Sequence, residues 1–232
     1  MLTIRVGTAL IVLTVVAVAG AGELPPPAIA PIAHYPLQTD GLDATGINDP
    51  MILVNAPFQD GGVYCNGIYS NDPGGCTVST PSLATLNFDS FALSCEFRID
   101  QYVPGVLNPI LIGGYGYRWI GAEVTPNGNL AFLCNNSDYQ VSSQVVTLDV
   151  WHELVLTYDA ATHIGKLFLD RRLVGTQEFV LIQGDDRDVS STNYGGGRTL
   201  RGLIREIVVY DAAFDPTLAE VSTWGSMKAL FR

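Results

Sequence analysis

The sequence predicts an all-β fold in which two antiparallel sheets pack face to face as a sandwich. Short runs rich in Val, Ile, Leu, Phe and Tyr alternate with clusters of Gly, Asp and Asn, as strands alternate with turns. Helical periodicity is nearly absent beyond the N-terminal segment. The chain of 232 residues is 47% hydrophobic and only 15% charged, which is enough apolar material for one core of ordinary size.

Residues 91–100 carry the clearest strand pattern, a strict alternation along ten positions. One face holds Phe91, Leu93, Cys95, Phe97 and Ile99, and the other holds Ala92, Ser94, Glu96, Arg98 and Asp100. Residues 129–134 repeat the pattern with Leu130, Phe132 and Cys134 in one phase. Both segments are expected to be strands with one buried face.

The chain is organised around residues 151–174, which we interpret as two strands joined by a polar turn at 158–162. Asp159 and Thr162 can accept or donate hydrogen bonds within such a turn. A last strand is expected over residues 200–210. Asp215 and Pro216 follow as the cap and first position of a short helix.

Two sets of residues resemble a known family. Trp151, Thr157, Tyr158, Asp159, Leu167, Leu169 and Asp170 resemble the central hairpin of concanavalin A-like jelly-roll domains of the laminin-G-like and pentraxin-like group. Gly202, Ile204, Glu206, Tyr210, Ala213 and Phe214 resemble the closing strand of laminin-G-like domains. Arg171 and Arg205 depart from the usual Gly and Asp. The resemblance implies a jelly roll, a fold that serves lectins, glucanases and adhesion modules alike.

Four cysteines are present, with no C-x-x-C pair or His spacing suited to zinc. Two disulfides in an oxidising compartment are therefore expected. Cys65 and Cys76 flank a turn-rich excursion that a bridge would close. Cys95 and Cys134 each share a strand face with large apolar residues, so we predict that they pair inside the sandwich.

The N-terminal segment is apolar and carries one charge, Arg5, between residues 2 and 22. Its length fits either a cleaved signal peptide or a retained transmembrane helix. In both cases the remainder of the chain is expected outside the cytoplasm, in the periplasm or secreted. The predicted division is 1–22 signal peptide or anchor, 23–31 Pro-rich linker, 32–221 laminin-G-like jelly roll, and 222–232 C-terminal tail or short helix.

The net charge of −11 disfavours nucleic acid and anionic lipid as partners of the folded part. Catalytic patterns are also missing. The glucanases of this fold use Glu-x-Asp-x-x-Glu on one strand, whereas the nearest approximation here is Glu96 with Asp100, separated by Arg98. No Ser or Cys lies at a spacing that would pair it with His34, His152 or His163 in a nucleophilic triad. The protein is therefore not expected to be an enzyme.

Calcium is the one metal that the sequence suggests. Asp185, Asp186 and Asp188 resemble the calcium loop of pentraxin-like domains, but the family's other ligands, expected near residues 115–121, are missing. The alternative is a solvated turn. For Asp40 and Asp43 we favour turn chemistry over metal binding. No other cofactor is expected.

A second candidate site contains aromatic residues beside glycines, which can stack on sugars or anchor a protein. Its residues are Tyr115, Tyr117, Arg118 and Trp119, with Tyr194 from a later polar stretch. The alternative is that the rings belong to the core, because they have the period of a strand face.

The first functional hypothesis is a non-catalytic interaction module, tethered to a membrane as a periplasmic accessory subunit of a photosynthetic or respiratory complex. The second is a calcium-assisted carbohydrate-binding domain. The third is a divergent glycoside hydrolase. The corresponding partners are proteins of a membrane complex or a glycan.

Overall fold

The computed structural model describes residues 29–83, 86, 89–113, 120–134, 138–181, 188–191 and 199–216. These residues form fifteen strands and no helix, as the sequence predicts. The strands are β1 (Ala33–Tyr35), β2 (Ile52–Val54), β3 (Phe58–Gln59), β4 (Gly62–Asn66), β5 (Thr77–Ser79), β6 (Ser90–Ile99), β7 (Asn108–Gly113), β8 (Ile120–Val124), β9 (Asn129–Cys134), β10 (Asp138–Val145), β11 (His152–Asp159), β12 (Ile164–Leu169), β13 (Arg172–Glu178), β14 (Val189–Ser191) and β15 (Arg201–Tyr210).

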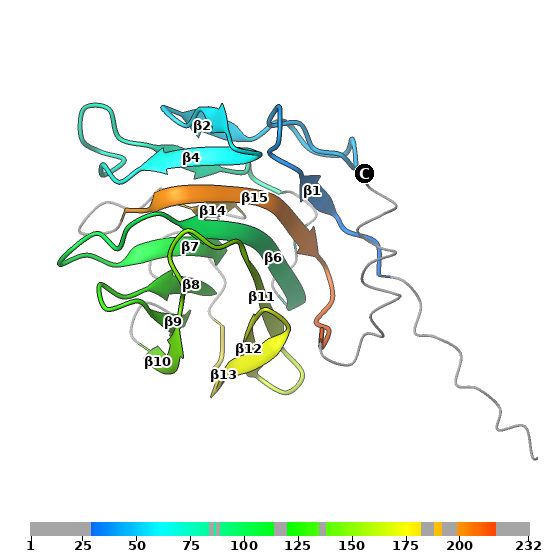
Figure 1. Ribbon diagram of the computed structural model, residues 1–232. Coiled ribbons are helices and arrows are strands. Elements are labelled where there is room, and N and C mark those ends of the chain that lie inside the picture. The colour runs from blue at the N-terminus through cyan, green and yellow to red at the C-terminus, as the bar shows by residue number, and fades with distance from the viewer. Residues whose placement is uncertain are drawn as a thin grey trace, which may run out of the picture.

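The strands form two antiparallel sheets that lie one behind the other (Figure 1). Sheet A has the order β13-β12-β11-β6-β15-β4-β3, with β1 paired to the second half of β15. Sheet B has the order β10-β9-β8-β7-β14-β5-β2. Strands β7 to β10 and β11 to β13 pair in sequence order, whereas β6, β14 and β15 pair with strands distant in sequence, as in a jelly roll.

The core lies between the two sheets and confirms the alternation of residues 91–100. Phe91, Leu93, Cys95, Phe97 and Ile99 all belong to the main buried cluster. In β9, Leu130, Phe132 and Cys134 join them from the opposite sheet. Each large buried side chain contributes about 1.5–3 kcal/mol relative to exposure, so this shared interior holds the sheets together.

The outer face of sheet A is more buried than the strand pattern predicts. Ala92, Val155, Phe168 and Tyr210 form a second buried cluster, against which Ile29, Val208 and Phe214 pack. Ile29 precedes the first strand and Phe214 follows the last one. The chain therefore covers part of the surface that an isolated β6 would expose to water.

The central hairpin is present as predicted, with β11 paired to β12 from Leu154–Leu169 to Asp159–Ile164. The next hairpin turns over two residues, Asp170 and Arg171, both with positive φ (48° and 64°). Such a turn is of type I′, which prefers Asn-Gly or Asp-Gly. Arg171 is thus in a left-handed backbone conformation that costs a non-glycine residue about 1–2 kcal/mol. The strand that follows this turn, β13, ends at Glu178.

Asp43 confirms the predicted turn chemistry. Its carboxylate accepts hydrogen bonds from the backbone N–H groups of His34 (2.9 Å), Thr45 (3.1 Å) and Asn48 (2.9 Å). Asp40 accepts one from Leu42 N–H at 3.1 Å. These carboxylates serve the opening turn.

The predicted N-terminal segment and linker, up to residue 28, lie outside the described residues, as does the tail from 217 onward. No helix of the described part is long and apolar enough to cross a membrane.

Neither predicted disulfide is formed between the four described and buried cysteines. The pairing of Cys95 with Cys134 is wrong. Cys134 Sγ donates a hydrogen bond to Gln177 Oε1 at 3.7 Å, so Cys134 lies beside Gln177 on β13. Cys95 lies on β6, which is three strands away from β13 in sheet A, and it is also four residues further along the strand direction than Gln177. That offset corresponds to roughly 19 Å, whereas a disulfide needs Cα atoms within about 7 Å.

The pairing of Cys65 with Cys76 stays a prediction. Cys76 Sγ lies 3.9 Å from the carbonyl oxygen of Tyr64, which directly precedes Cys65. The two thiols thus come from neighbouring parts of the core, although β4 and β5 belong to different sheets.

Candidate functional site

A groove of about 310 Å³ lies at one end of sheet A. We call it the hairpin groove; it is lined by Thr157, Asp159, Thr162, Ile164, Lys166, Ala213, Phe214 and Asp215. One wall is the β11–β12 hairpin and the other is the segment that follows β15. In Figure 1 this segment, drawn in orange-red, descends toward the β11 and β12 end of the sheet.

An ion pair joins the two walls. Lys166 Nζ lies 3.2 Å from Asp215 Oδ2, and the lysine side chain remains 37% exposed. At this exposure the pair contributes at most about 1 kcal/mol to stability. Its importance is geometric, because it holds the 213–215 segment beside the hairpin.

Asp159 closes the hairpin end of the groove and is held in one orientation. Its Oδ1 accepts from the backbone N–H of Ala161 at 2.9 Å and from Ser90 Oγ at 3.3 Å, and its Oδ2 accepts from Thr162 Oγ1 at 3.0 Å. The hydrogen bonds from Ala161 and Thr162 lower the pKa of Asp159. The groove therefore carries a fixed, ionised carboxylate at neutral pH.

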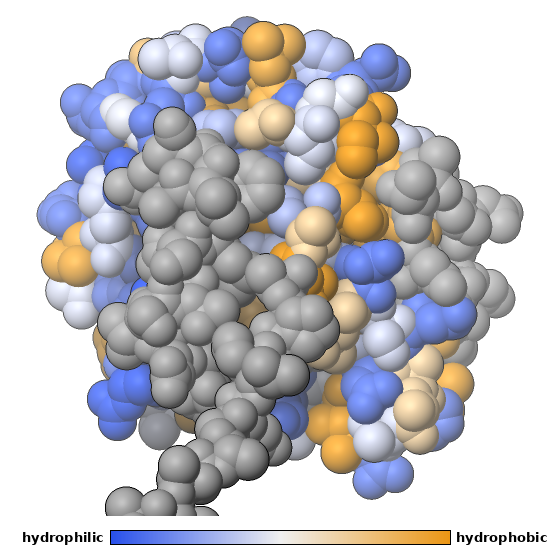
Figure 2. Space-filling view, turned by 90° about the vertical axis from the view of Figure 1, so that its right-hand side faces the viewer, coloured by the Kyte–Doolittle hydropathy of each residue, from blue (hydrophilic) through white to orange (hydrophobic). Residues whose placement is uncertain are grey.

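Phe214 supplies the aromatic part of the groove. Its ring packs edge-on against Tyr210, with centroids 5.1 Å apart and planes at 85°. This is the geometry that aromatic pairs prefer. The groove lining combines this ring with the polar side chains of Asp159, Lys166 and Asp215, so it can hold an amphipathic ligand. Figure 2 shows the side of the molecule that lies to the right in Figure 1, where the described hydrophobic and hydrophilic residues are mixed.

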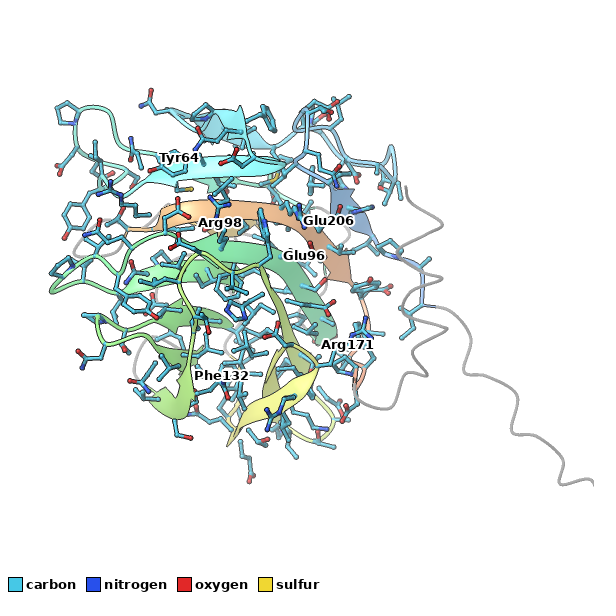
Figure 3. All side chains as sticks on the ribbon, in the orientation of Figure 1. Tyr64, Glu96, Arg98, Phe132, Arg171 and Glu206 are labelled. Carbon is cyan, nitrogen blue, oxygen red and sulfur yellow. The ribbon has the colours of Figure 1, made fainter. Side chains whose placement is uncertain are left out.

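A second polar group, the charged band, crosses the outer face of sheet A near the start of β11 (Figure 3). It consists of Glu96, Arg98, Trp151, Glu153, Arg171 and Arg205. Arg205 Nε donates to Glu96 Oε2 at 2.8 Å, and Arg171 Nε donates to Glu153 Oε2 at 3.3 Å. The guanidinium carbon of Arg205 lies 4.0 Å from the centre of the Trp151 ring.

Glu96 and Glu153 are directly opposite each other on β6 and β11. The Cβ atoms at such positions lie about 5 Å apart, and like charges directly opposite each other are destabilising. Arg205 and Arg171 compensate this repulsion, one for each carboxylate. Glu96 is thus part of a half-buried ion-pair network on the face of β6 that the alternation assigns away from the core.

Most of the predicted site residues lie outside the described part of the chain. This applies to Tyr115, Tyr117, Arg118, Trp119 and Tyr194 of the aromatic site and to Asp185 and Asp186 of the calcium loop. Their predicted roles stay predictions. Asp188 is described: its Oδ2 accepts from Ser79 Oγ at 3.2 Å, at the start of β14.

The described residues contain no group of three or more His, Cys, Asp or Glu side chains able to hold a metal ion. Of the three predicted calcium ligands, the structure describes Asp188 alone. Since calcium takes six to eight oxygen ligands, Asp188 would need the neighbouring aspartates and further donors to form a site.

The hairpin groove was not predicted from the sequence. From the sequence, Asp159 and Phe214 were noted only for the fold, as residues of a turn or of the family pattern, and Lys166 had no assigned role. Lys166 and Asp215 are 49 positions apart in the sequence, so no local spacing could reveal their contact. The faint signal was that the hairpin and the closing strand both carry residues of the family pattern, because these segments meet at the groove.

Residues 72–220 match the family model described as the concanavalin A-like lectin/glucanases superfamily. Among solved structures, Trypanosoma rangeli sialidase is similar, with a TM-score of 0.64 and 18% identity over 86% of this chain. The match covers 32% of the sialidase, so this chain spans about a third of its length. At this identity, the likeness concerns the fold.

Domain 4 of AbnA, an extracellular arabinanase of family GH43 from Geobacillus stearothermophilus, was solved in complex with arabinotriose and is similar over nearly its whole length. The TM-score is 0.62 at 15% identity, and the match covers 83% of this chain and 97% of that domain. No curated protein sequence matches this chain significantly.

Proposed function

Because the chain belongs to the concanavalin A-like lectin/glucanase superfamily, we propose that it is a non-catalytic carbohydrate-binding module that works outside the cytoplasm. The observation that carries this proposal is the hairpin groove, which combines one aromatic ring with several hydrogen-bonding side chains. A glycan would occupy this groove.

The lining of the hairpin groove suits the chemistry of sugars. The Asp159 and Asp215 carboxylates can accept hydrogen bonds from hydroxyl groups, and Lys166 can donate them. Phe214 offers an apolar surface for the C–H face of a pyranose or furanose ring. A volume of about 310 Å³ lies at the lower end of the range for small-molecule sites, which is consistent with one or two sugar units.

The comparison with domain 4 of AbnA supports a glycan as partner. That domain is a separate module of an arabinanase and was solved with arabinotriose. It matches this chain over almost its full length, whereas the sialidase is a much longer protein. A self-standing module of the same fold can therefore bind a sugar chain.

A divergent glycoside hydrolase is the second candidate, and the opposed pair Glu96 and Glu153 favours it. Retaining glycosidases hold two carboxyl groups about 5–5.5 Å apart. We nevertheless favour binding without catalysis, because Arg205 and Arg171 each engage one of these carboxylates. Each guanidinium occupies an oxygen that a catalytic carboxyl group would have to present to the glycosidic bond. Release of reducing sugar from β-glucan or arabinan that stops in a Glu153→Gln variant would establish the hydrolase instead.

A glycan array followed by calorimetry tests the proposal. The full chain should bind at least one glycan class, and Ala213→Trp, which fills the groove, should weaken that binding at least tenfold. Lys166→Ala should weaken it less, because it removes one donor and loosens one wall. Arg172→Ala, an exposed change at the start of β13, is the matched control and should bind as the unaltered protein does.

Two further variants locate the site if the groove is not used. Glycan binding that survives Ala213→Trp but is lost in Tyr117→Ala would move the site to the aromatic segment predicted from the sequence. Binding lost in Asp186→Ala and in the presence of a chelator would establish calcium assistance. Absence of binding to every glycan would contradict the proposed function.

The comparisons give no support to a subunit of a membrane complex. That role remains an outcome of the same experiments: native protein purified in detergent would then come with stoichiometric membrane partners and would bind no glycan. N-terminal sequencing of the mature protein tests the proposed export, since cleavage after the apolar segment would place the module outside the cytoplasm.

A further inference from the structure

We infer that the hairpin groove selects glycans that carry no carboxylate and that Asp159 is the residue that sets this selectivity. This inference rests on the proposed function and specifies its ligand class. It follows from the charges that the two walls of the groove bring together.

Three ionisable side chains line the groove: Asp159, Lys166 and Asp215. Lys166 and Asp215 form an ion pair at 3.2 Å, so their charges largely cancel for a ligand in the groove. The negative charge of Asp159 then decides the local potential. A carboxylate-bearing sugar would have to approach this charge within a few ångströms.

Asp159 cannot easily turn away from such a ligand. Ala161, Thr162 and Ser90 donate hydrogen bonds to its two oxygens, and the turn depends on these bonds. The same bonds lower the pKa of the carboxylate, which keeps it charged at neutral pH. A fixed negative charge thus borders the groove under physiological conditions.

Lys166 does not offer an acidic sugar a ready partner. To bind a ligand carboxylate it would have to leave Asp215, which would place a second negative charge in the groove. The whole chain carries a net charge of −11, and this field also opposes the approach of anions. Neutral glycans meet none of these penalties.

Paired glycans test the inference. The probes are neutral oligosaccharides and the same oligosaccharides bearing a terminal sialic acid, together with galacto-oligosaccharides and the matching oligogalacturonides. At about 20 mM salt the unaltered protein should bind the neutral member of a pair at least about fivefold more tightly. The ratio should fall toward one at about 0.5 M salt, because salt screens exposed charges.

Asp159→Asn keeps an oxygen for the Ala161 N–H and removes the charge, so the preference for the neutral member should shrink severalfold. Asp72→Asn, an exposed change in the loop between β4 and β5, is the matched control and should leave the ratio unchanged. The salt dependence of the unaltered protein provides a readout that does not depend on how well Asp159→Asn folds.

The outcomes separate this inference from the proposed function. If sialylated glycans bind equally well or better, and Ala213→Trp abolishes their binding, the groove is a glycan site but the charge inference is wrong. An unaltered ratio in Asp159→Asn also overturns it. If no glycan binds at all, the proposed function fails and the inference falls with it.

Discussion

His34 on β1 and Glu206 on β15 are joined in the structure: His34 Nε2 lies 2.9 Å from Glu206 Oε2. Gln38 Nε2 donates to the other carboxylate oxygen, Oε1, also at 2.9 Å. Glu206 lies at a bulge in β15 with a φ of 54°. The cluster ties the first strand to the last strand beside the opening turn.

This cluster predicts a loss of stability in acid. Burial alone would raise the pKa of Glu206, but the hydrogen bonds from His34 and Gln38 and the charge of His34 lower it below its ordinary value. Since the unfolded chain takes up the proton first, the stabilisation is present above about pH 4.3 and is lost as the pH falls through the folded-state pKa. Asp43, whose pKa is also lowered, acts in the same direction.

The measurement is the thermal midpoint between pH 7 and pH 3. The Glu206→Gln variant should be less stable at pH 7 by about 2 kcal/mol, the value of a hydrogen bond to a charged group, and should lose less on acidification. Glu178→Gln, an exposed change at the end of β13, should follow the unaltered protein. Parallel pH profiles for the unaltered protein and Glu206→Gln would contradict the assignment.

The turn between β12 and β13 predicts a stabilising substitution. Arg171 has a φ of 64°, and glycine removes the Cβ strain of that conformation. The lost ion pair with Glu153 is worth less than about 1 kcal/mol, because the arginine side chain is 39% exposed. Arg171→Gly should therefore be about 1 kcal/mol more stable than Arg171→Ala, which loses the same ion pair but keeps the strain. Equal urea midpoints would show that the turn is relaxed.

At Gly202, in contrast to Arg171, a substitution is expected to be strongly destabilising, because the site has no room for one methyl group. A Cβ there would lie 2.0 Å from the carbonyl oxygen of Arg98 on the paired strand β6. Gly202→Ala should cost about 3 kcal/mol or more, at the upper end for overpacking. Gly105→Ala is the comparison, because nothing lies within 4 Å of its Cβ position and only its φ of 74° opposes the change. Denaturant titration should therefore rank the Gly105 variant as clearly more stable.

The cysteines give a prediction for oxidising conditions. Cys65 and Cys76 should form a disulfide, whereas Cys95 and Cys134 should not. A disulfide that closes the loop between Cys65 and Cys76 should stabilise the folded protein by about 3 kcal/mol in the chain-entropy model. A reductant should lower the melting temperature of the oxidised protein but not that of a Cys65→Ala, Cys76→Ala double variant. Mass spectrometry of the unreduced protein showing Cys95 linked to Cys134 would refute the strand registers described above.

Local patterns were sufficient for the elements of the fold. The alternation from Phe91 to Ile99 identified the core face of β6, and the polar turn around Asp159 identified the β11–β12 hairpin. Both depend on neighbours within a few residues, because side-chain direction in a strand repeats every second position. The alternation shows which face of the sheet a side chain lies on, but it does not show which strands of the two sheets lie opposite each other. The predicted pairing of Cys95 with Cys134 failed for this reason.

The sequence by itself determined that this chain is a two-sheet β-sandwich of the concanavalin A-like kind. Its alternating strands and its hairpin and closing-strand residues are enough for that. Only the tertiary structure decided that Lys166 meets Asp215, that Glu96 faces Glu153, and that Ile29 and Phe214 cover the outside of sheet A. These contacts join segments far apart in the chain, and they exist only after the strands have paired in one order and register.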